Sequence, residues 1–476
     1  MKDFLQRVKS GLKTDFTFKH ADFKYTLIFC GILAVLIIIS LFVPFFIWVT
    51  LVVAIALAFL SKGGRALYIP VFMFSFIHVW KPAGVAFQGL PLFNFLLPIV
   101  IGWLLLKYII AVCKKQKQMD WLPTVFTIFL IFLLLMPFSF AFSFDGLLSI
   151  EIAFGIMQVV AVVYVAYLYR ADFNLKELFV VLFAGIFVSF AFGWIAYLPQ
   201  LERVYEMVLK APNRYGGLNA EMNLFANDVL VALIVLMVLF FNGVMRTFFY
   251  PAFVFLSVCL IVTGSKAGFL IMAMVLAVYG VMCLVRSLRS KDKSYLYHAM
   301  ATVGIYILLC LVFFDITKHM FWRFGTERMD GVGYLDNLTT FRFGIWMGYL
   351  EAIFSSWQTA IFGHGVCAPW LAVSGEGHGP ISAHNSFLTV IYHIGLFGMF
   401  VIALFALLLL LRIVKNKQMN WWNVAIVFIV IGVTNMHLTT IVFGLSIHLI
   451  VLCPALTYKG EEVEHNLKDA KRGQRG

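Results

Sequence analysis

Residues 382–398 have the sequence SAHNSFLTVIYHIGLFG, and they mark the point where a long polar segment, 315–385, meets an apolar run. The rest of the chain is an almost unbroken series of apolar runs, so this segment is its one long interruption. Connections in compact proteins are usually short, on the order of 4–6 residues, and much longer ones tend to be functional. We therefore expect 315–385 to be an active-site segment that lies on one face of a membrane.

The composition is that of a membrane protein over its whole length. Of the 476 residues, 62% are hydrophobic and only 12% are charged, whereas soluble domains have roughly 25% charged residues. The first strongly apolar run starts near Tyr25 and lacks a small-residue cleavage pattern, so we expect it to be an uncleaved insertion signal. Basic cytoplasmic loops explain the net charge of +13 better than nucleic-acid binding does.

Neither a disulfide framework nor a metal site is expected. Six of the seven cysteines lie in or beside apolar runs, and Cys367 stands alone in the polar segment. His364 and His378 flank a Gly-rich span with Glu376, but their spacing matches no standard ligand pattern, so a flexible lid is the plainer interpretation. No Walker A loop is present, and ATP-driven activity is therefore not supported.

Fourteen apolar runs approach the length of a spanning helix, which needs roughly 20 residues. All should be helical, because lipid cannot satisfy open backbone polar groups. Several runs are short, so the predicted fold is an all-α, polytopic helical membrane protein with about 12–14 transmembrane helices. The expected spans are 26–43, 45–61, 67–80, 92–112, 122–141, 147–169, 178–198, 224–242, 248–262, 267–285, 297–314, 386–411, 422–436 and 439–455.

Lysine and arginine in the connections predict the orientation. They concentrate at the N-terminus, in alternate loops and in the C-terminal tail, which places both termini in the cytoplasm. We expect a cytoplasmic N-terminal segment, a transmembrane bundle of about 11 helices, a large extracytoplasmic catalytic loop, C-terminal transmembrane helices and a cytoplasmic tail. The expected bounds of these five segments are 1–25, 26–314, 315–385, 386–455 and 456–476.

Three outward segments, 199–223, 263–266 and 315–385, carry positive charge against this bias. Long loops escape the bias, so the two shorter segments are the better evidence. An anionic ligand at the outer face would account for all three. Within the longest segment, apolar residues recur near a 3.6-residue period over 341–357, which predicts an amphipathic helix in the membrane interface that brings Arg342 over the bundle.

His384 is the candidate proton acceptor. It precedes an apolar run that we expect to form a helix. Asn385 and Ser386 are residue types that suit the N-terminus of that helix. A histidine there can accept a proton near neutral pH, or it can simply form a hydrogen bond at the membrane interface.

Arg214 is the candidate anion-binding residue. It lies just before a helix that Asn223 can cap, so the helix end and the guanidinium could hold a phosphate together. The plainer interpretation is an arginine that reaches toward lipid headgroups. Lys266 and Arg342 have similar alternatives, a snorkelling lysine in a polar hairpin and a charge on a solvated helix face.

Four stretches, taken in order, resemble the O-antigen ligase and O-unit polymerase superfamily. RYGGLNAEMNLFA at 214–226 resembles its outer-loop Arg–Gly–Asn pattern. TGSKAGFL at 263–270 resembles its Ser–Arg–Gly turn, with Lys266 where arginine is usual. FRFGIWMGYLEAIFSSWQTAIFGHG at 341–365 and SAHNSFLTVIYHIGLFG at 382–398 together resemble its signature region of Arg, Trp, GlyHisGly and HisAsn.

Members of that superfamily are integral membrane glycosyltransferases of the cytoplasmic (inner) membrane. They move a glycan from a polyprenyl pyrophosphate carrier to an acceptor at the outer face. The resemblance implies that His384 is the general base, that Arg214 binds the pyrophosphate, and that Arg342 and Lys266 assist. It also implies that neither a metal, a cofactor nor a nucleotide sugar is needed. The predicted substrate-binding residues are Lys266, Asn223, Asn385 and His364.

We therefore predict a polysaccharide repeat-unit polymerase or an O-antigen-type ligase, with the polymerase narrowly preferred. Direct attack by an acceptor hydroxyl predicts inversion, because no carboxylate is placed to act as a nucleophile. The expected partners are a polyprenyl-pyrophosphate-linked glycan donor, a glycan or lipid-linked acceptor and the bilayer, without nucleic acid. The alternative is a lipid-linked oligosaccharide flippase or exporter, but apart from Glu151 and His448 few ionisable residues lie within the apolar runs.

Overall fold

The protein folds as a bundle of apolar helices. The computed structural model describes residues 2–18, 20, 22–76, 92–119, 121–135, 146–197, 214–219, 222–318, 342–365, 368, 371, 383, 385–415 and 450–451. All regular secondary structure in these residues is helical, which confirms the predicted all-α class. Seven of the described helices are long and apolar enough to cross a membrane, so the protein is a multi-pass membrane protein.

The observed helices follow the apolar runs of the sequence closely. The first half contains α1 (Lys2–Asp15), α2 (Phe23–Phe42), α3 (Phe46–Leu60), α4 (Tyr68–Phe74), α5 (Phe93–Cys113), α6 (Trp121–Leu135), α7 (Gly146–Leu168) and α8 (Leu175–Phe192). The second half contains α10 (Met222–Phe241), α11 (Phe249–Val262), α12 (Lys266–Ser290), α13 (Ser294–Val312), α16 (Arg342–Ile353), α17 (Trp357–Phe362) and α18 (Ser386–Lys415). Short 3-10 helices are η1 (Gly63–Leu67), η3 (Gly193–Tyr197) and η4 (Gly217–Asn219). The expected spans 422–436 and 439–455 lie outside the described residues, except for Ile450 and Val451.

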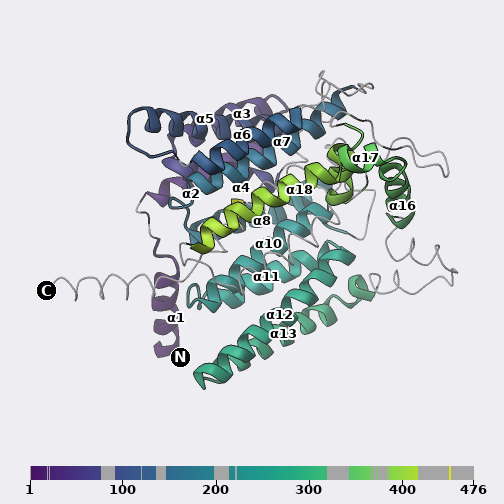
Figure 1. Ribbon diagram of the computed structural model, residues 1–476. Coiled ribbons are helices and arrows are strands. Elements are labelled where there is room, and N and C mark those ends of the chain that lie inside the picture. The colour runs from purple at the N-terminus through teal and green to yellow at the C-terminus, as the bar shows by residue number, and fades with distance from the viewer. Residues whose placement is uncertain are drawn as a thin grey trace.

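The long helices lie side by side, and two helices at opposite ends of the bundle run across its axis (Figure 1). One is α1, near the N-terminus, and the other is α16, which follows the polar segment. The chain enters α16 and α17 from the end of α13 and leaves them into α18. This arrangement gives the bundle two distinct ends, one marked by α1 and the other by α16.

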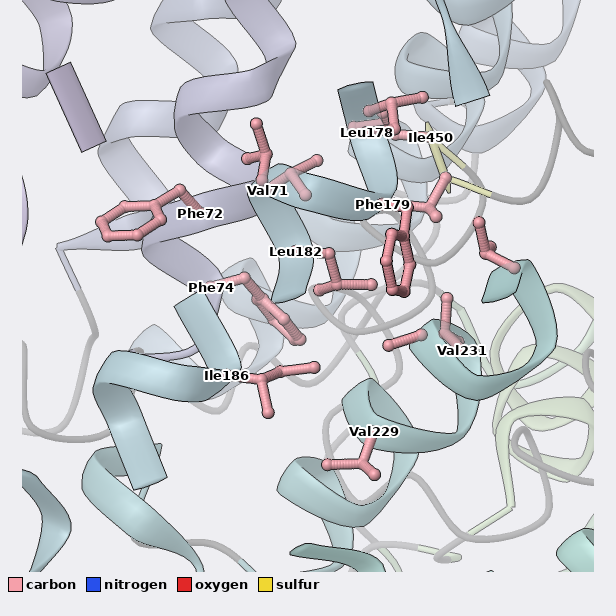
Figure 2. Packing of buried hydrophobic residues seen from close by; sticks show 14 of the residues in the cluster. Val71, Phe72, Phe74, Leu178, Phe179, Leu182, Ile186, Val229, Val231 and Ile450 are labelled. Carbon is pink, nitrogen blue, oxygen red and sulfur yellow. The ribbon is translucent and has the colours of Figure 1, made fainter. Parts of the chain in front are cut away.

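Helix α10 is the interior element against which the others pack. Of the residues in its apolar span, 94% are buried, and it contacts α8, α11 and α12. Figure 2 shows Val229 and Val231 of α10 facing side chains of α8, among them Phe179 and Leu182. A helix that is apolar all round is one that neighbours enclose. In a bilayer such a helix is held by close packing, because lipid tails are as apolar as its partners.

Helix α4 departs from the predicted span 67–80. Its described helical part covers seven residues, Tyr68–Phe74, all of them buried, and seven residues rise only about 10 Å. It packs between α2, α5 and α8 instead of facing lipid, and Val71, Phe72 and Phe74 lie in the core of Figure 2. An apolar run does not distinguish an interior segment from a spanning helix, which is why the sequence suggests a longer element.

The predicted amphipathic helix 341–357 ends earlier in the structure. Helix α16 ends at Ile353, and α17 begins after Ser356. The Ser356 side chain accepts a hydrogen bond from the Thr359 backbone N–H at 3.1 Å, and the Thr359 hydroxyl accepts one from the Ser356 backbone N–H at 3.1 Å. This reciprocal cap starts a new helix at the last residue of the predicted one.

Candidate functional site

Arg214 joins two segments that are far apart in sequence. Its Nε donates a hydrogen bond to the Thr263 carbonyl oxygen at 2.7 Å, and its Nη2 donates to Asn223 Oδ1 at 3.0 Å. The Ser265 hydroxyl donates to the same Asn223 oxygen at 3.2 Å. We call these four residues the Arg214 cluster. The two shorter basic outward segments of the sequence therefore meet in space.

The turn at 263–266 is shaped to receive Arg214. Gly264 has φ +58°, and a Cβ built on it would lie 3.1 Å from Arg214 Cγ. Glycine is favoured there both because it adopts this left-handed conformation and because the arginine side chain passes so closely. Ser265 then caps α12 by accepting from the Gly268 N–H at 3.2 Å. Lys266 is thus the first residue of a capped helix directly beside the cluster.

Two helix N-termini meet at the Arg214 cluster. Helix α10 begins at Met222 and α12 at Lys266, and the Asn223–Ser265 hydrogen bond links their first turns. The expectation that Asn223 caps its helix is wrong, because Asn223 lies inside α10 and its side-chain oxygen accepts from Arg214 and Ser265. Helix N-termini carry partial positive charge, so the cluster combines two dipole ends with the Arg214 guanidinium, and Lys266 follows Ser265 directly in the chain.

The second group of predicted residues surrounds His384, which itself lies outside the described residues. On one side of it, the Ala383 carbonyl accepts a hydrogen bond from Trp346 Nε1 at 2.9 Å. On the other side, Asn385 Oδ1 accepts from the backbone N–H groups of Phe387 at 3.0 Å and of the next residue at 3.2 Å. The prediction that Asn385 suits the N-terminus of this helix is confirmed, and the chain is held at both neighbours of the predicted base.

Arg342 belongs to this second group through the geometry of α16. It is the first residue of the helix, and Trp346 follows it by four positions. Residues four apart lie on the same face of a helix, so the face that contacts Ala383 also carries Arg342. Figure 1 shows α16, α17 and the start of α18 together at the end of the bundle opposite α1.

The Arg214 cluster lies at the same end. Helices α12 and α13 are contacting neighbours joined by a short turn at 291–293. The start of α12 therefore lies at the end where α13 finishes, which is where the chain continues toward α16 (Figure 1). Both groups of predicted residues thus occupy one end of the bundle.

His364 has a supporting position in the structure. Its ring stacks on Tyr392 with 4.5 Å between centroids, and its Nε2 lies 3.0 Å from the Ala352 carbonyl, so that nitrogen carries the proton. Tyr392 packs against Tyr349 of α16 in the small core that also holds Ala383. These contacts fix α16 against α18, and a substrate-binding role for His364 stays a prediction.

The GlyHisGly motif, 363–365, fills a break in α18. Gly395 has φ +69° and interrupts the helix. The carbonyls of Tyr392 and His393 accept hydrogen bonds from the backbone N–H groups of His364 at 2.7 Å and Gly365 at 3.0 Å. A Cβ on Gly363 would lie 2.5 Å from the backbone of His393, so only glycine permits this approach. The motif is therefore the backbone partner of an unwound helical turn.

A buried polar group in α10 was missed by the sequence reasoning. Asn219 and Asp228 are fully buried, and Asn219 Nδ2 donates to Asp228 Oδ2 at 3.3 Å. The sequence contains a signal for such a group. The stretch NLFAND at 223–228 has three amide or acid residues at the start of an apolar helix. Glu151 and His448 had been singled out instead, and the structure describes neither side chain.

No site for a metal ion is apparent among the residues that the structure describes, since no three histidine, cysteine or acidic side chains gather there. No model of a protein family matches the chain, and no significantly similar curated protein or solved structure was found.

Proposed function

We propose that the protein is a glycosyltransferase that moves an oligosaccharide from a polyprenyl pyrophosphate carrier to a glycan acceptor at the outer face of the cytoplasmic membrane. One observation carries the proposal: Arg214 meets Asn223 and the 263–266 turn at the N-termini of two helices. The resemblance of the stretches around these residues to the O-antigen ligase and O-unit polymerase superfamily supplies the reaction.

The Arg214 cluster suits the diphosphate of such a carrier. A carbonyl oxygen and an amide oxygen accept hydrogen bonds from the guanidinium, which fixes its position before a ligand arrives. Guanidinium groups bind phosphate oxygens through charge-assisted hydrogen bonds, and helix N-termini favour anions. As the glycosyl bond breaks, negative charge grows on the leaving pyrophosphate, and preorganised positive charge stabilises it most at that moment.

His384 acts as the general base in this scheme. It takes the proton of the acceptor hydroxyl while the hydroxyl oxygen forms a bond to the anomeric carbon. The bond from that carbon to the phosphate oxygen breaks, and its electron pair leaves with the pyrophosphate. The attack comes from the face opposite the leaving group and inverts the anomeric configuration. The hydrogen bonds of Ala383 and Asn385 hold the backbone on either side of His384 in the sequence.

Transfer from a lipid-linked donor tests the proposal directly. Purified protein should form longer glycans with His384 and Arg214 intact and lose this activity when either is replaced by alanine. Lys293→Gln is the matched control, because Lys293 is an exposed cation at the other end of the bundle. Ladders of repeat units would identify the preferred polymerase, and a single transfer would identify a ligase. Full transfer by His384→Ala at normal expression would overturn the assignment.

A flippase or exporter is the second candidate, and the buried Asn219–Asp228 pair favours it. A protein that carries a diphosphate through the bilayer needs polar groups below the membrane surface, and intramembrane acids often mark such pathways. Flipping of a fluorescent lipid-linked glycan in liposomes, without glycan transfer, would favour this candidate. Transfer that persists in Asp228→Asn would favour the glycosyltransferase.

A further inference from the structure

A basic cavity lies at the other end of the bundle from the Arg214 cluster. The cavity has a volume of about 350 Å³ and opens between the last turns of α10 and α12. It is lined by Phe241, Met282, Val285, Arg286, Arg289 and Ser290. The four α12 positions before Ser290 recur at intervals of three or four residues, so one helix face supplies an apolar floor and two arginines.

Arg286 is held in place before any ligand binds. Its Nη1 donates to the Phe241 carbonyl oxygen at 2.6 Å, and its guanidinium lies 4.6 Å from the Phe241 ring and 4.7 Å from the Tyr295 ring. The carbonyl bond uses one of five N–H donors of the guanidinium. Stacking on aromatic rings orients an arginine while its charge stays intact.

The surrounding turns are strongly basic. Arg246, Lys291 and Lys293 lie in the loops that follow α10 and α12, at the end that the positive-charge bias assigns to the cytoplasm. Asp292 is the acid in these turns, and its Oδ1 accepts from the Ser294 N–H at 2.9 Å. That hydrogen bond is the main reason that the pKa of Asp292 lies below its usual value, and Arg246 adds to the effect. Positive charge therefore dominates around the cavity.

Helix α12 also carries an apolar stripe. Val281, Leu284 and Leu288 are exposed and repeat at intervals of three and four, so they form a single face of α12, turned by roughly 100° or more around the helix from Arg286 and Arg289. A soluble anion carries no part that would contact such a face. A phospholipid has both parts, a charged headgroup and acyl chains.

We propose that this cavity binds the phosphate headgroup of an anionic phospholipid whose acyl chains lie in the hydrocarbon beside α12. Basic pockets between transmembrane helices at the cytoplasmic face suit such headgroups. Stabilisation of the α12 dipole by cations near its C-terminus accounts for the positions of Arg286 and Arg289. It does not account for the cavity or for the aromatic contacts that orient Arg286.

Native mass spectrometry of the full-length protein in detergent tests the proposal. Phosphatidylglycerol should remain bound where phosphatidylcholine does not, and affinity should fall about fivefold for each arginine removed in Arg289→Gln and in Arg286→Gln/Arg289→Gln. Arg289 is exposed, so the single variant keeps the contacts of Arg286 with Phe241 and Tyr295 and should fold normally. The matched control is Lys293→Gln, which removes a nearby charge that does not line the cavity.

A competition with inorganic phosphate separates a lipid from a free anion. If the lipid is the ligand, millimolar phosphate should leave phosphatidylglycerol bound. Displacement by phosphate, equal retention of both lipids, or an equal loss of affinity in Lys293→Gln would each overturn the proposal. Because the measurement uses binding alone, its result does not depend on the proposed glycosyl transfer.

Discussion

Near α1, charged side chains pair with each other, whereas in the Arg214 cluster a carbonyl and an amide oxygen accept hydrogen bonds from the guanidinium. Arg65 forms two hydrogen bonds to the Asp22 carboxylate, and Lys62 lies 3.5 Å from it. His20 Nδ1 lies 3.0 Å from the buried carboxylate of Glu177. These contacts of Asp22 and Glu177 fasten the chain. The two oxygens that accept from Arg214 carry no charge themselves, and they position its guanidinium.

The charged side chains near α1 also connect the N-terminal segment to distant parts of the chain. Asp15 Oδ2 accepts from the backbone N–H groups of Thr247 at 2.8 Å and Phe248 at 2.9 Å, which caps the start of α11. Lys176 Nζ donates to the Thr17 carbonyl at 2.6 Å. These contacts dock the N-terminal segment onto distant loops. The contrast between these pairs and the Arg214 cluster separates charges that fasten the structure from a charge that suits a ligand, and the following predictions test it.

The largest effect is expected from His384→Ala. Removing a general base should lower kcat for transfer by roughly 10²- to 10⁴-fold, because the acceptor hydroxyl is a poor nucleophile while protonated. The measurement is the initial rate of glycan transfer from a lipid-linked donor. Donor binding should change little, so a large rise in donor KM with normal kcat would contradict the role of base.

The second-largest effect is expected from Arg214→Ala. It should lower kcat/KM for glycan transfer by roughly 10²- to 10³-fold, which is typical for removal of a preorganised group that stabilises developing charge. Arg214→Lys should recover only part of this, because lysine keeps the charge and loses the forked donor geometry. Initial rates over a range of donor concentrations measure both. Equal activity of Arg214→Ala and the Lys293→Gln control would show that Arg214 only fastens the loop.

Asn223→Asp replaces the amide oxygen that accepts from Arg214 with a carboxylate oxygen. The result is an ion pair like the one between Arg65 and Asp22. A carboxylate about 5 Å from a bound phosphate costs about 3 kcal/mol at an effective dielectric of 20, or roughly a hundredfold in affinity. Asn223→Ala removes the two hydrogen bonds that Asn223 Oδ1 accepts, of which one holds Arg214, and should cost only about fivefold in donor affinity. The measurement is donor affinity in each variant. The comparison fails if the aspartate variant binds donor as well as the alanine variant does.

Asp22→Asn should have the smallest effect and should leave transfer unchanged. The hydrogen bond from Arg65 is the main reason that the pKa of Asp22 falls from 3.8 to about 2. Since its folded pKa is depressed, its contribution to stability is present above pH 3.8 and is lost as the pH falls toward 2. The variant should lose roughly 1 kcal/mol or less at neutral pH, and thermal unfolding at pH 7 and pH 3 should differ less than in the wild type. An altered transfer rate would contradict a purely fastening role.

The sequence predicts the helices well because apolar length alone decides them in a membrane. Its failures have identifiable causes. An apolar run such as Tyr68–Phe74 does not show whether its partners are lipid or protein. The break at Gly395 depends on backbone partners about thirty positions earlier, at His364 and Gly365, and no local pattern contains that information.

The candidate site, like the fold, could be predicted from the sequence only in part. Arg214 and Lys266 stood out because positive charge occurred where the loop bias disfavours it, and the structure joins their segments through Asn223. The capping role expected for Asn223 was wrong, because helix bounds are uncertain by a residue or two from sequence. Asp228 was missed because a single acid in an apolar helix is easily overlooked.

The pairing of 363–365 with the broken turn of α18 has a mechanical consequence. Pulling the two apart would leave the carbonyls of Tyr392 and His393 without hydrogen bonds inside an apolar span, where water cannot replace them. Helices α16 and α17 are thus coupled to the first turns of α18. Any displacement of α16 would therefore carry the backbone around Asn385 with it.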